Sequence, residues 1–343
     1  MTQKTIALDA MGGDHGPPVT VAAAHMALKE IEDIGLVLVG DETELNQELE
    51  RHGLSNHPKI RIQHASEVVT MDDHPAQALK KKKDSSMRVA INLVQQGAVQ
   101  ACVSAGNTGA LMATSKFVLK TVSGISRPAI CTQLPGIKGH THMLDLGANP
   151  ECTAEILAEF ALMGSVLAQS VDGIEQPSVG LLNIGSEAIK GSELIKAANQ
   201  LLDESRLNYC GYVEGDDIYK GTVDVVVSDG FVGNVSLKSA EGLAALVNDV
   251  LQSEFRRNFL TKLAALCAMP VLRAVRRRLD PRRYNGASLL GLNGIVIKSH
   301  GSADTSSFFY AIKIASIEIE KDVPQRISRA IESYISQSEE AVT

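Results

Sequence analysis

Short runs of apolar residues recur along the chain and predict buried β-strands. The runs are rich in Val, Ile and Leu and lie at residues 5–10, 34–40, 59–63, 101–106, 143–148, 178–185, 223–230 and 295–301. Most are separated by segments in which apolar residues return every three or four positions, the spacing of an amphipathic helix. Strands that alternate with helices form a mainly parallel sheet covered on both faces. The pattern therefore predicts an α/β protein of three layers, α/β/α.

The length of the chain sets the expected domain organisation. Its 343 residues suffice for one large α/β domain or two smaller ones, and either would bury most of its apolar surface. We expect a single large domain that spans residues 1–335, with a basic helical hairpin inserted at 255–283 and a polar C-terminal tail at 336–343. No uncharged apolar stretch approaches the roughly 18 residues of a membrane span, and the N-terminal residues lack the apolar region of a signal peptide. The expectation is a cytoplasmic protein.

The charge of the chain is negative overall but uneven. The formal net charge is −7 at pH 7, which argues against nucleic acid as a partner. The segment from Phe255 to Arg283 is the exception, because it holds nine basic residues and a single acid, Asp280. The five cysteines are far apart and have no paired spacing, so we interpret them as small core residues.

Polar, glycine-rich turns follow most of the predicted strands and are the first sign of a ligand site. Seven of them lie at residues 9–17, 104–110, 145–150, 183–191, 213–217, 228–234 and 299–304. Each alone has the composition of an ordinary strand-to-helix connection. Parallel sheets bind ligands at the carboxyl ends of their strands. Seven such turns on one sheet edge would therefore surround a single crevice with backbone N–H groups and small side chains.

The turn SAGNTGA has the composition of an anion site. It lies between a predicted strand and a predicted helix, so backbone N–H groups and the positive end of the helix face the crevice. Its spacing matches neither GxGxxG nor GxxxxGK[ST], so phosphate or a phosphate-bearing substrate is favoured over NAD or a nucleoside triphosphate. The alternative is a helix cap without a ligand, because Ser104, Asn107 and Thr108 are all capping residue types.

Charged residues in two other turns are candidates for chemistry. Lys190 follows a predicted strand closely and could hold its ammonium over the crevice, for phosphate or for a developing oxyanion. The alternative is a solvated surface lysine. Asp229 and Asn234 come after the apolar run VDVVV, and the alternative for Asp229 is a helix cap.

Metal and covalent chemistry are not indicated by the sequence. Asp9 and Asp14 lack a third fixed ligand, and His140 and His142 share one side of a strand without a matching partner, which favours surface positions. The chain has no GxSxG nucleophile elbow, no HExxH motif and no cysteine in a reactive setting. We therefore predict no metal, no cofactor and no covalent enzyme intermediate.

Seven stretches between Asp9 and Asp304 carry a resemblance to a known family. In chain order they read DAMGGDHGP, SAGNTGA, DLGAN, LLNIGSEAIKG, VEGDD, DVVVSDGFVGN and GASLLGLNGIVIKSHGSAD. Together they are similar to the motifs of the bacterial phosphate acyltransferases of phospholipid synthesis. The resemblance implies a homodimer with a fold similar to the phosphotransacetylase and isocitrate dehydrogenase-like group. It also implies transfer of a fatty acyl group from acyl carrier protein to inorganic phosphate, giving acyl phosphate for a membrane glycerol-3-phosphate acyltransferase.

That reaction agrees with the turns on one physical point. Phosphate is itself the nucleophile, so the enzyme need only hold the dianion in line with the thioester carbonyl and stabilise the oxyanion. We assign Lys190 to the phosphate or the oxyanion and Asn234 to the carbonyl oxygen. Asp229 is assigned to the orientation of the Lys190 or the Asn234 side chain. The predicted phosphate-binding residues are Ser104, Gly106, Asn107, Thr108 and Gly109. The rest of the predicted crevice consists of Asp9, Gly12, Gly13, Asp14, Asn149, Gly185 and His300.

The basic segment is expected to form two amphipathic helices hinged at Pro270. Its predicted membrane or carrier-protein contacts are Phe259, Leu263, Leu266, Arg273, Arg276, Arg277 and Arg278. Three uses remain open. The hairpin binds anionic lipid, which would associate the protein peripherally with the inner face of the cell membrane; it docks acyl carrier protein; or its apolar stripe forms the dimer seam.

Two other functions compete with acyl transfer. A dehydrogenase of the isocitrate dehydrogenase-like group would share the general architecture and would give a difference spectrum with NAD or NADP. A non-catalytic scaffold on the membrane surface would explain the basic helices, but it would leave the seven polar turns without a purpose.

Overall fold

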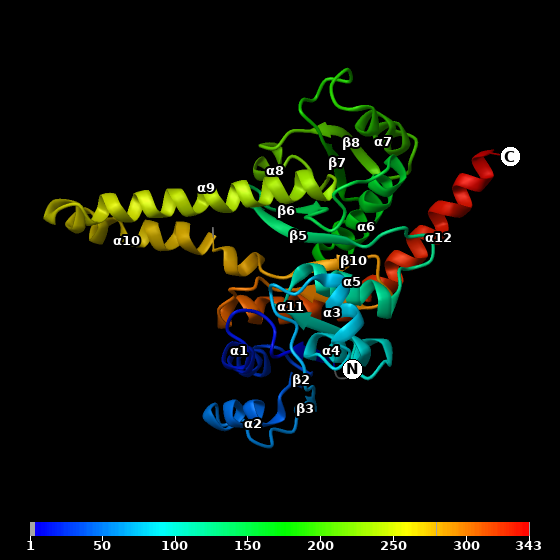
Figure 1. The fold of residues 1–343 in the computed structure, drawn as a ribbon. Helices are drawn as coiled ribbons and strands as arrows, with labels where there is room; N and C mark the ends of the chain where they lie inside the picture. Colours follow the sequence, from blue (N-terminus) through cyan, green and yellow to red (C-terminus); the bar gives the residue numbers. More distant parts are fainter. Residues whose placement is uncertain (1–3, 279, 343) are drawn as a thin grey trace.

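The computed structural model describes residues 4–278 and 280–342, without the side chains of residues 276, 278, 281 and 337–342. Its centre is a sheet of 11 strands in the order β3-β2-β1-β4-β11-β10-β5-β6-β9-β7-β8 (Figure 1). The strands are β1 (Lys4–Asp9), β2 (Ile34–Gly40), β3 (Ile60–His64), β4 (Ala101–Ser104), β5 (Ala129–Gly136), β6 (Gly139–Leu144), β7 (Ser178–Leu182), β8 (Asn208–Val213), β9 (Val225–Val227), β10 (Ala287–Leu290) and β11 (Ile295–Lys298).

Helices cover both faces of this sheet, which confirms the three-layer α/β/α prediction. One face packs against α1 (Pro17–Glu30), α2 (Glu42–Arg51), α6 (Ala154–Asp172), α7 (Glu193–Asp203), α11 (Thr305–Lys321) and α12 (Val323–Val342). The other packs against α3 (Pro75–Lys81), α4 (Ser86–Gln95), α5 (Thr108–Leu119), α8 (Asp217–Lys220) and the start of α9 (Gly230–Arg256). Apolar side chains between these layers form the core.

The direction of the strands changes in the middle of the sheet. Seven of the ten pairings among the described strands are parallel, whereas β10 is antiparallel to β11 and β5, and β6 is antiparallel to β5. The β5–β6 and β10–β11 connections are two and four residues long, too short for the crossover that parallel strands need. As a result, β1 to β4 and β11 point one way, and β6 to β9 point the other.

Helix α6 forms the centre of a large part of the core. Of its 19 residues, 13 are buried. Gly164 allows its close approach to the sheet, because a Cβ there would lie 2.6 Å from Val225 and 2.8 Å from Leu144. By length and composition alone α6 could cross a membrane, but its burial against β6 and β9 makes it a core helix.

Helix α9 and helix α10 (Phe259–Arg278) leave the body together as a long projection, whose residues 241–278 we call the arm (Figure 1). The predicted hinge at Pro270 is wrong, since Pro270 lies inside α10. The turn falls instead at Asn258, whose Oδ1 accepts the N–H of Thr261 at 2.9 Å and whose own N–H donates to the Thr261 hydroxyl at 3.1 Å. This reciprocal cap starts α10, and water can satisfy the carbonyl that Pro270 leaves unbonded on an exposed helix.

Two local expectations also differ from the structure. Helix α12 runs to Val342, so residues 336–342 continue a helix instead of forming a separate tail. Cys102 and Cys131 are buried as expected, but Cys210 and Cys267 are exposed. Cys210 lies on the edge strand β8 and Cys267 on the arm, where a side chain has solvent beside it instead of a second layer.

Candidate active site

The seven polar turns fall into two groups at opposite ends of the strands. The first group follows β1, β4 and β11 and consists of residues 9–17, 104–110 and 299–304. The second group follows β6, β7, β8 and β9 and consists of residues 145–150, 183–191, 213–217 and 228–234. Because these two sets of strands run in opposite directions, the seven turns do not all open at one edge of the sheet.

Three polar residues end neighbouring strands in the first group. In the register of the sheet, Asp9 of β1 lies beside Ser104 of β4, and Ser104 lies beside Lys298 of β11. Their exposed fractions are 1%, 0% and 9%. A carboxylate, a hydroxyl and an amine thus meet at the carboxyl ends of three parallel strands, which is where sheets of this kind bind ligands.

Asp9 is a buried carboxylate with one oxygen unpaired. Its Oδ2 accepts the hydroxyl of Ser104 at 2.6 Å, while its Oδ1 has no hydrogen-bond partner among the described residues. Burial raises the pKa of Asp9, against the lowering effect of its hydrogen bonds. Gly12 is required beside it, since a Cβ there would lie 2.5 Å from Asp9 Oδ2 and 2.9 Å from the nitrogen of Gly106.

Lys298 is the functional candidate that sequence reasoning missed. Its Nζ donates to the carbonyl oxygen of Ala105 at 3.4 Å and to that of Ser299. Burial lowers the pKa of Lys298 to about 8, and attraction to Asp9 and Asp14 opposes this shift. A lysine at the last position of the apolar run IVIK was the available signal, because buried lysines are rare. Buried groups with shifted pKa values concentrate at functional sites.

The predicted phosphate-binding turn serves in part as the cap of α5. Asn107 is the N-cap, and its Oδ1 accepts the N–H of Ala110 at 3.0 Å. Its Nδ2 donates to the carbonyl oxygens of Met71 at 2.8 Å and Asp73 at 3.1 Å. The side chain of Asn107 is therefore occupied by local structure, which is the alternative that its capping chemistry suggested.

The other residues of this turn lie between Asp9 and solvent. Gly106 is buried, and its N–H donates to Ser104 Oγ at 3.1 Å. Thr108 and Gly109 are exposed on the first turn of α5, where the free backbone N–H groups carry the positive end of the helix. Gly109 also allows close packing, because a Cβ there would lie 2.8 Å from Pro75.

Asp14 and His300 form the exposed rim of the first group. The N–H of Asp14 donates to the carbonyl oxygen of Gly301 at 2.9 Å, and Gly13 makes the preceding bend at φ +84°. The N–H of His300 donates to Asn285 Oδ1 at 2.9 Å. The structure thus brings together, with Lys298, the predicted residues Asp9, Gly12, Gly13, Asp14, Ser104, Gly106, Asn107, Thr108, Gly109 and His300.

The second group is organised around Asp145, a fully buried residue that the sequence analysis did not single out. Its carboxylate accepts N–H groups of Ile130 at 2.8 Å, Ala148 at 3.3 Å and Asn149 at 2.6 Å. The Asn149 side chain donates to Asp145 Oδ2 at 2.9 Å and to the carbonyl of Pro128 at 2.8 Å. The side-chain amide of Asn149 therefore holds the turn together, and Asn149 is buried.

Asp229 and Asn234 lie at the start of α9. Asp229 is the N-cap of α9, and its Oδ1 accepts the N–H of Val232 at 2.8 Å. This contact is the helix cap that the sequence offered as the alternative. Asn234 follows one turn later and is exposed. Its side chain lies against Gly147, where a Cβ would approach it to 3.5 Å.

Lys190 lies in an exposed ion pair within its own turn. Its Nζ is 2.9 Å from Glu187 Oε2, and the two side chains are 43% and 58% exposed. The lysine folds over Gly185, where a Cβ would lie 2.5 Å from Lys190 Cδ. Asn183 closes the turn by donating to the carbonyl oxygens of Gly185 and Lys190. Lys190 and Asn234 thus belong to the group at the opposite strand ends from Ser104 and Lys298.

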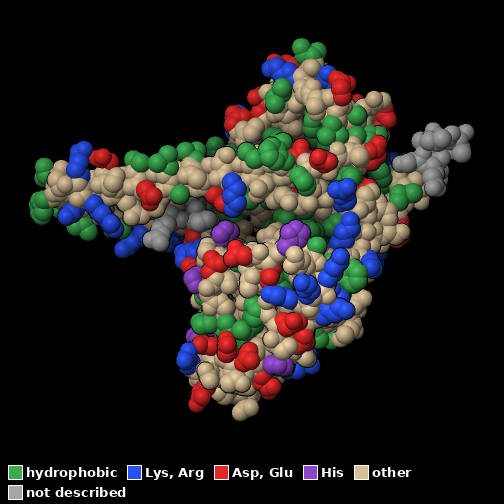
Figure 2. Space-filling view, in the orientation of Figure 1, with side chains coloured by type: hydrophobic (Ala, Val, Ile, Leu, Met, Phe, Trp, Pro, Cys, Tyr) green, Lys and Arg blue, Asp and Glu red, His purple; other side chains and the backbone are tan. Residues whose placement is uncertain are grey.

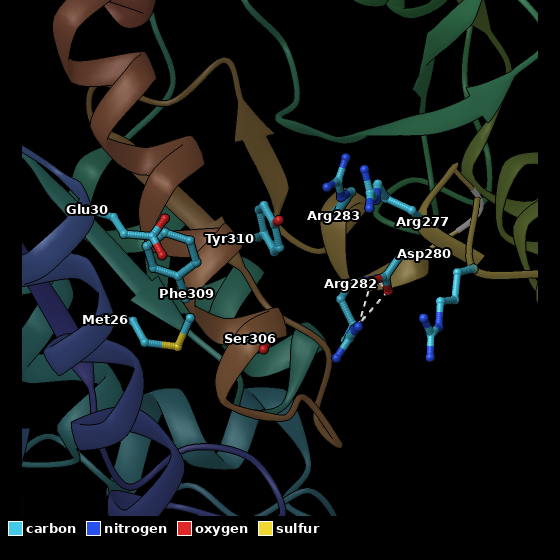
Figure 3. A pocket seen from close by; sticks show the side chains of 10 residues that line it. Met26, Glu30, Arg277, Asp280, Arg282, Arg283, Ser306, Phe309 and Tyr310 are labelled. Carbon is cyan, nitrogen blue, oxygen red and sulfur yellow. Dashed lines mark hydrogen bonds and ion pairs between the residues drawn. The ribbon is translucent and has the colours of Figure 1, made fainter. Parts of the chain in front are cut away.

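A pocket of about 330 Å³ lies beside the first group, between α1, α11 and the base of the arm (Figure 3). Arg282 connects it to the first group, since this side chain pairs with Asp280 at 2.7 Å and lies 3.7 Å from Asp304, the N-cap of α11. Arginines 273, 277 and 283 and the rings of Phe309 and Tyr310 also line it. The pocket suits an anionic ligand with an apolar part.

The predicted arm contacts are exposed where the structure describes them. This holds for Phe259, Leu263, Leu266, Arg273 and Arg277, whereas the side chains of Arg276 and Arg278 lie outside the described residues. By contrast, the predicted surface position of His142 is wrong, because its side chain is 2% exposed. His142 and the partly exposed His140 both face Asp172, the partner that the sequence pattern did not reveal.

The fold places the chain in a known structural class. A phosphotransacetylase from Streptococcus pyogenes is similar with a TM-score of 0.60 and 17% sequence identity, covering 96% of this chain and 94% of its own. The EutD phosphotransacetylase from Staphylococcus aureus gives a TM-score of 0.57 at 16% identity with the same coverage. The three-layer α/β/α arrangement of this chain is therefore that of the phosphotransacetylase fold.

Sequence comparison then identifies the family. Residues 4–326 match the model of a family described as fatty acid synthesis protein. A curated phosphate acyltransferase from Nitrosococcus oceani is 59% identical over 98% of both chains, and one from Methylococcus capsulatus is 60% identical over 94% of this chain and 95% of its own. This chain belongs to the fatty acid synthesis protein family, and it is an acyltransferase of lipid biosynthesis. The dehydrogenase and scaffold alternatives are thereby set aside.

Proposed function

We propose that the enzyme transfers a fatty acyl group from acyl carrier protein to inorganic phosphate and releases an acyl phosphate for phospholipid synthesis. The relatives named phosphate acyltransferase support phosphate as the acceptor. The observation that carries the proposal is the buried row of Asp9, Ser104 and Lys298 beside the positive end of α5. It offers an ammonium and helix N–H groups to a small anion.

In the proposed reaction the first group holds phosphate. Lys298, with a pKa of about 8, is mostly protonated at neutral pH and has a third N–H beyond the two that meet backbone carbonyls. A phosphate oxygen attacks the thioester carbonyl carbon, so a carbon–oxygen bond forms while the carbon–sulfur bond breaks. The sulfur leaves as the thiolate of the carrier and takes up the proton that hydrogen phosphate releases as the acyl phosphate forms. Holding the anion in line with the carbonyl supplies most of the catalysis.

The proposed roles of Lys190, Asn234 and Asp229 require that the second group of turns lies close to the first. Their turns follow strands that run opposite to those of the first group, so Lys190 and Asn234 need a further element to reach the thioester held at Lys298. Helix α9 is one link within the chain, because the charge of Lys238 on α9 also lowers the pKa of Lys298; another copy of the chain is a second. The proposed homodimer is one such arrangement. An exposed apolar row on α9, formed by Leu243, Leu246, Val247, Val250 and Leu251, is consistent with it.

Phosphate-dependent release of thiol tests the proposal. We expect the purified protein to release carrier thiol from an acyl-acyl carrier protein at a rate that rises and saturates with phosphate. Sulfate, which has a similar size but forms no stable acyl product, should inhibit without supporting turnover. Thiol release that is independent of phosphate would show a thioesterase and would contradict the proposal.

The basic residues of the predicted hairpin divide between the two ends of the arm. Arg256, Arg257 and Lys262 are exposed near its tip, beside the turn at Asn258. Hydrophobic side chains run along the arm and gather at its tip (Figure 2), where Phe259 and Leu260 are 78% and 74% exposed. Arg273 and Arg277 lie instead at its base, in the pocket beside α1 and α11. We therefore propose that the tip enters the membrane surface on the cytoplasmic side and that the base docks the carrier protein.

Loss of the apolar tip is expected to weaken membrane binding. Replacing Phe259 and Leu260 by serine removes two side chains that gain free energy on leaving water, so we expect the partition onto anionic vesicles to fall at least about tenfold. Vesicle flotation measures this partition. Ile137→Ser is the matched control, because Ile137 is 71% exposed on the β5–β6 connection, outside the arm. Equal flotation of the tip variant and the control would rule out insertion of the tip.

A further inference from the structure

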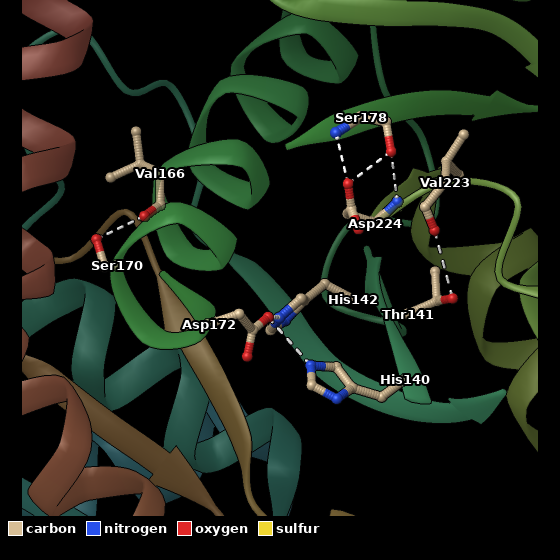
Figure 4. Close-up of polar contacts among 9 residues, drawn as sticks. All are labelled: His140, Thr141, His142, Val166, Ser170, Asp172, Ser178, Val223 and Asp224. Atoms are coloured by element: carbon tan, nitrogen blue, oxygen red, sulfur yellow. Dashed lines mark hydrogen bonds and ion pairs between the residues drawn. The ribbon is translucent and has the colours of Figure 1, made fainter. Parts of the chain in front are cut away.

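Two histidines and an aspartate converge at the end of the sheet away from the second group. His140 and His142 lie on β6, and Asp172 is the last residue of α6 (Figure 4). The Nε2 atoms of His140 and His142 lie 3.1 Å and 2.6 Å from the same oxygen, Asp172 Oδ2. All three ligand atoms lie within 4.8 Å of one another. Both imidazoles thus direct the same ring nitrogen at one point.

We propose that this cluster is a binding site for a divalent transition metal ion, with zinc as the best match. Imidazole nitrogens suit zinc and its neighbours, whereas magnesium and calcium prefer oxygen ligands throughout. In a tetrahedral zinc site with bonds of about 2.0–2.1 Å, ligand atoms stand about 3.3 Å apart. The two nitrogen–oxygen separations in the cluster, 3.1 Å and 2.6 Å, are shorter than this by about 0.2 Å and 0.7 Å, so the side chains move apart by rotation when the ion enters. Water completes the coordination.

The charges around the cluster favour a cation. The carboxylate of Asp172 lies against both imidazoles through the same oxygen, Oδ2, so it brings a negative charge to the point on which the two ring nitrogens converge. Asp172 also ends a helix of 19 residues, and the C-terminus of a helix carries partial negative charge. A bound dication would take the place of the hydrogen bonds in the cluster, with the two imidazole nitrogens and the carboxylate oxygen as its ligands.

The position of the cluster gives the ion both access and a structural effect. His142 is buried, but the side chains of His140 and Asp172 are 29% and 19% exposed, which leaves a route from solvent. The ion would join β6, near the middle of the sheet, to the end of the core helix α6. We therefore expect zinc to stabilise the folded protein, because it binds the folded arrangement and not the separated residues.

Zinc titration of the full-length, chelator-treated protein tests the site. We expect one Zn²⁺ to bind with competition against a chromophoric chelator, and the melting temperature to rise with zinc concentration. His140→Ala removes one ligand from a partly exposed position and should weaken zinc binding at least about 100-fold. His52→Ala is the matched control, since His52 belongs to another histidine pair, with a ring-centroid distance of 6.2 Å to His25. It should leave the affinity unchanged.

A second variant keeps the test independent of folding. Asp172→Asn preserves shape and one hydrogen-bond acceptor but removes the anionic ligand, so it should also weaken zinc binding while circular dichroism stays that of the parent protein. Anomalous diffraction at the zinc edge should show the ion between the two imidazoles. Zinc affinity that is unchanged in both His140→Ala and Asp172→Asn, or that is lost in His52→Ala instead, would overturn the proposal.

Discussion

Replacing Lys298 with methionine is expected to lower kcat/KM for phosphate at least about 100-fold. The loss follows from the removal of the one ammonium that the described residues bury beside Asp9 and Ser104 at the phosphate site, since a positioned cation is worth several kcal/mol to a transition state with developing negative charge. Methionine keeps the unbranched apolar stem in place. Initial rates of phosphate-dependent thiol release measure the effect.

The stability of this variant separates catalysis from folding. A buried ammonium is costly to desolvate, so Lys298→Met should unfold at the same temperature as the parent or higher. Lys196→Met is the matched control, because Lys196 forms an exposed pair with Glu193 on α7 and should change neither quantity. If Lys298→Met kept the full rate of the parent enzyme, the ammonium of Lys298 would have no role in the mechanism.

The pH dependence of the reaction should report the same amine. Burial lowers the pKa of Lys298 from 10.5 to about 8, so its charge is present at pH 7 and is lost as the pH rises through about 8. We expect kcat/KM for phosphate to fall over this range. Stability moves in the opposite direction, because the unfolded chain binds the proton more tightly between pH 8 and 10.5, and unfolding therefore becomes less favourable as the pH rises. Lys298→Met should show neither change through this group.

The sequence predicted the layers of the fold because buried parallel strands leave a strong signal. The run from Ile34 to Gly40 is buried at every position, and unbroken apolar runs of this kind mark strands covered on both faces. Three strands were missed. β8 contains polar positions at an edge of the sheet, and β10 has four residues of which the first two are Ala and Ser. β5 reads AICTQLPG, so polar residues and a Pro-Gly pair follow a short apolar start.

The reversal of strand direction had a sequence signal that was not used. The segment from Leu134 to His140 reads LPGIKGH, with Gly139 at φ +133°, and a Pro-Gly pair followed by a second glycine between apolar segments is typical of a hairpin. The two halves of the sheet are antiparallel because three successive pairings, β11–β10, β10–β5 and β5–β6, each reverse the strand direction. For that reason the sequence identified the polar turns correctly but could not show that they form two groups.

Individual site residues were harder to predict, since capping and ligand binding use the same residue types. Asp229 and Asn107 both accept a helix N–H, and nothing in their local sequence separates that contact from a substrate contact. Lys298 was missed for a different reason, because its local sequence does not show what surrounds it. Its importance comes from Asp9 and Ser104, residues far away in the chain that the register of the sheet places beside it.

Glu318 is the buried acid with the largest expected effect on stability. It lies on α11 with an exposed fraction of 3%, and its carboxyl accepts the hydroxyl of Ser288 on β10. Burial raises the pKa of Glu318 from 4.5 to about 7, with the bond to Ser288 opposing the shift. The folded protein therefore favours the protonated acid. At pH 8 the group carries a charge in the core without a cation to pair with it among its described contacts.

Glutamine at position 318 is expected to remove a loss of stability that the parent protein suffers as the pH rises. The unfolded acid releases its proton near pH 4.5 and the folded acid near pH 7, so stability from this group is present below pH 4.5 and declines up to pH 7. A shift of this size corresponds to about 3 kcal/mol. Urea unfolding from pH 4.5 to 8 should show Glu318→Gln gaining up to that amount over the parent as the pH rises.

The control for this effect lies on the same helix. Glu320 pairs with Lys4 at 2.7 Å on the surface, and exposed ion pairs contribute about 1 kcal/mol or less. Glu320→Gln should therefore change the unfolding free energy little at any pH. If the unfolding free energies of the parent and Glu318→Gln changed with pH in parallel, Glu318 would stay charged in the folded core. The hydrogen bond from the Ser288 hydroxyl would then have to stabilise the buried carboxylate by itself.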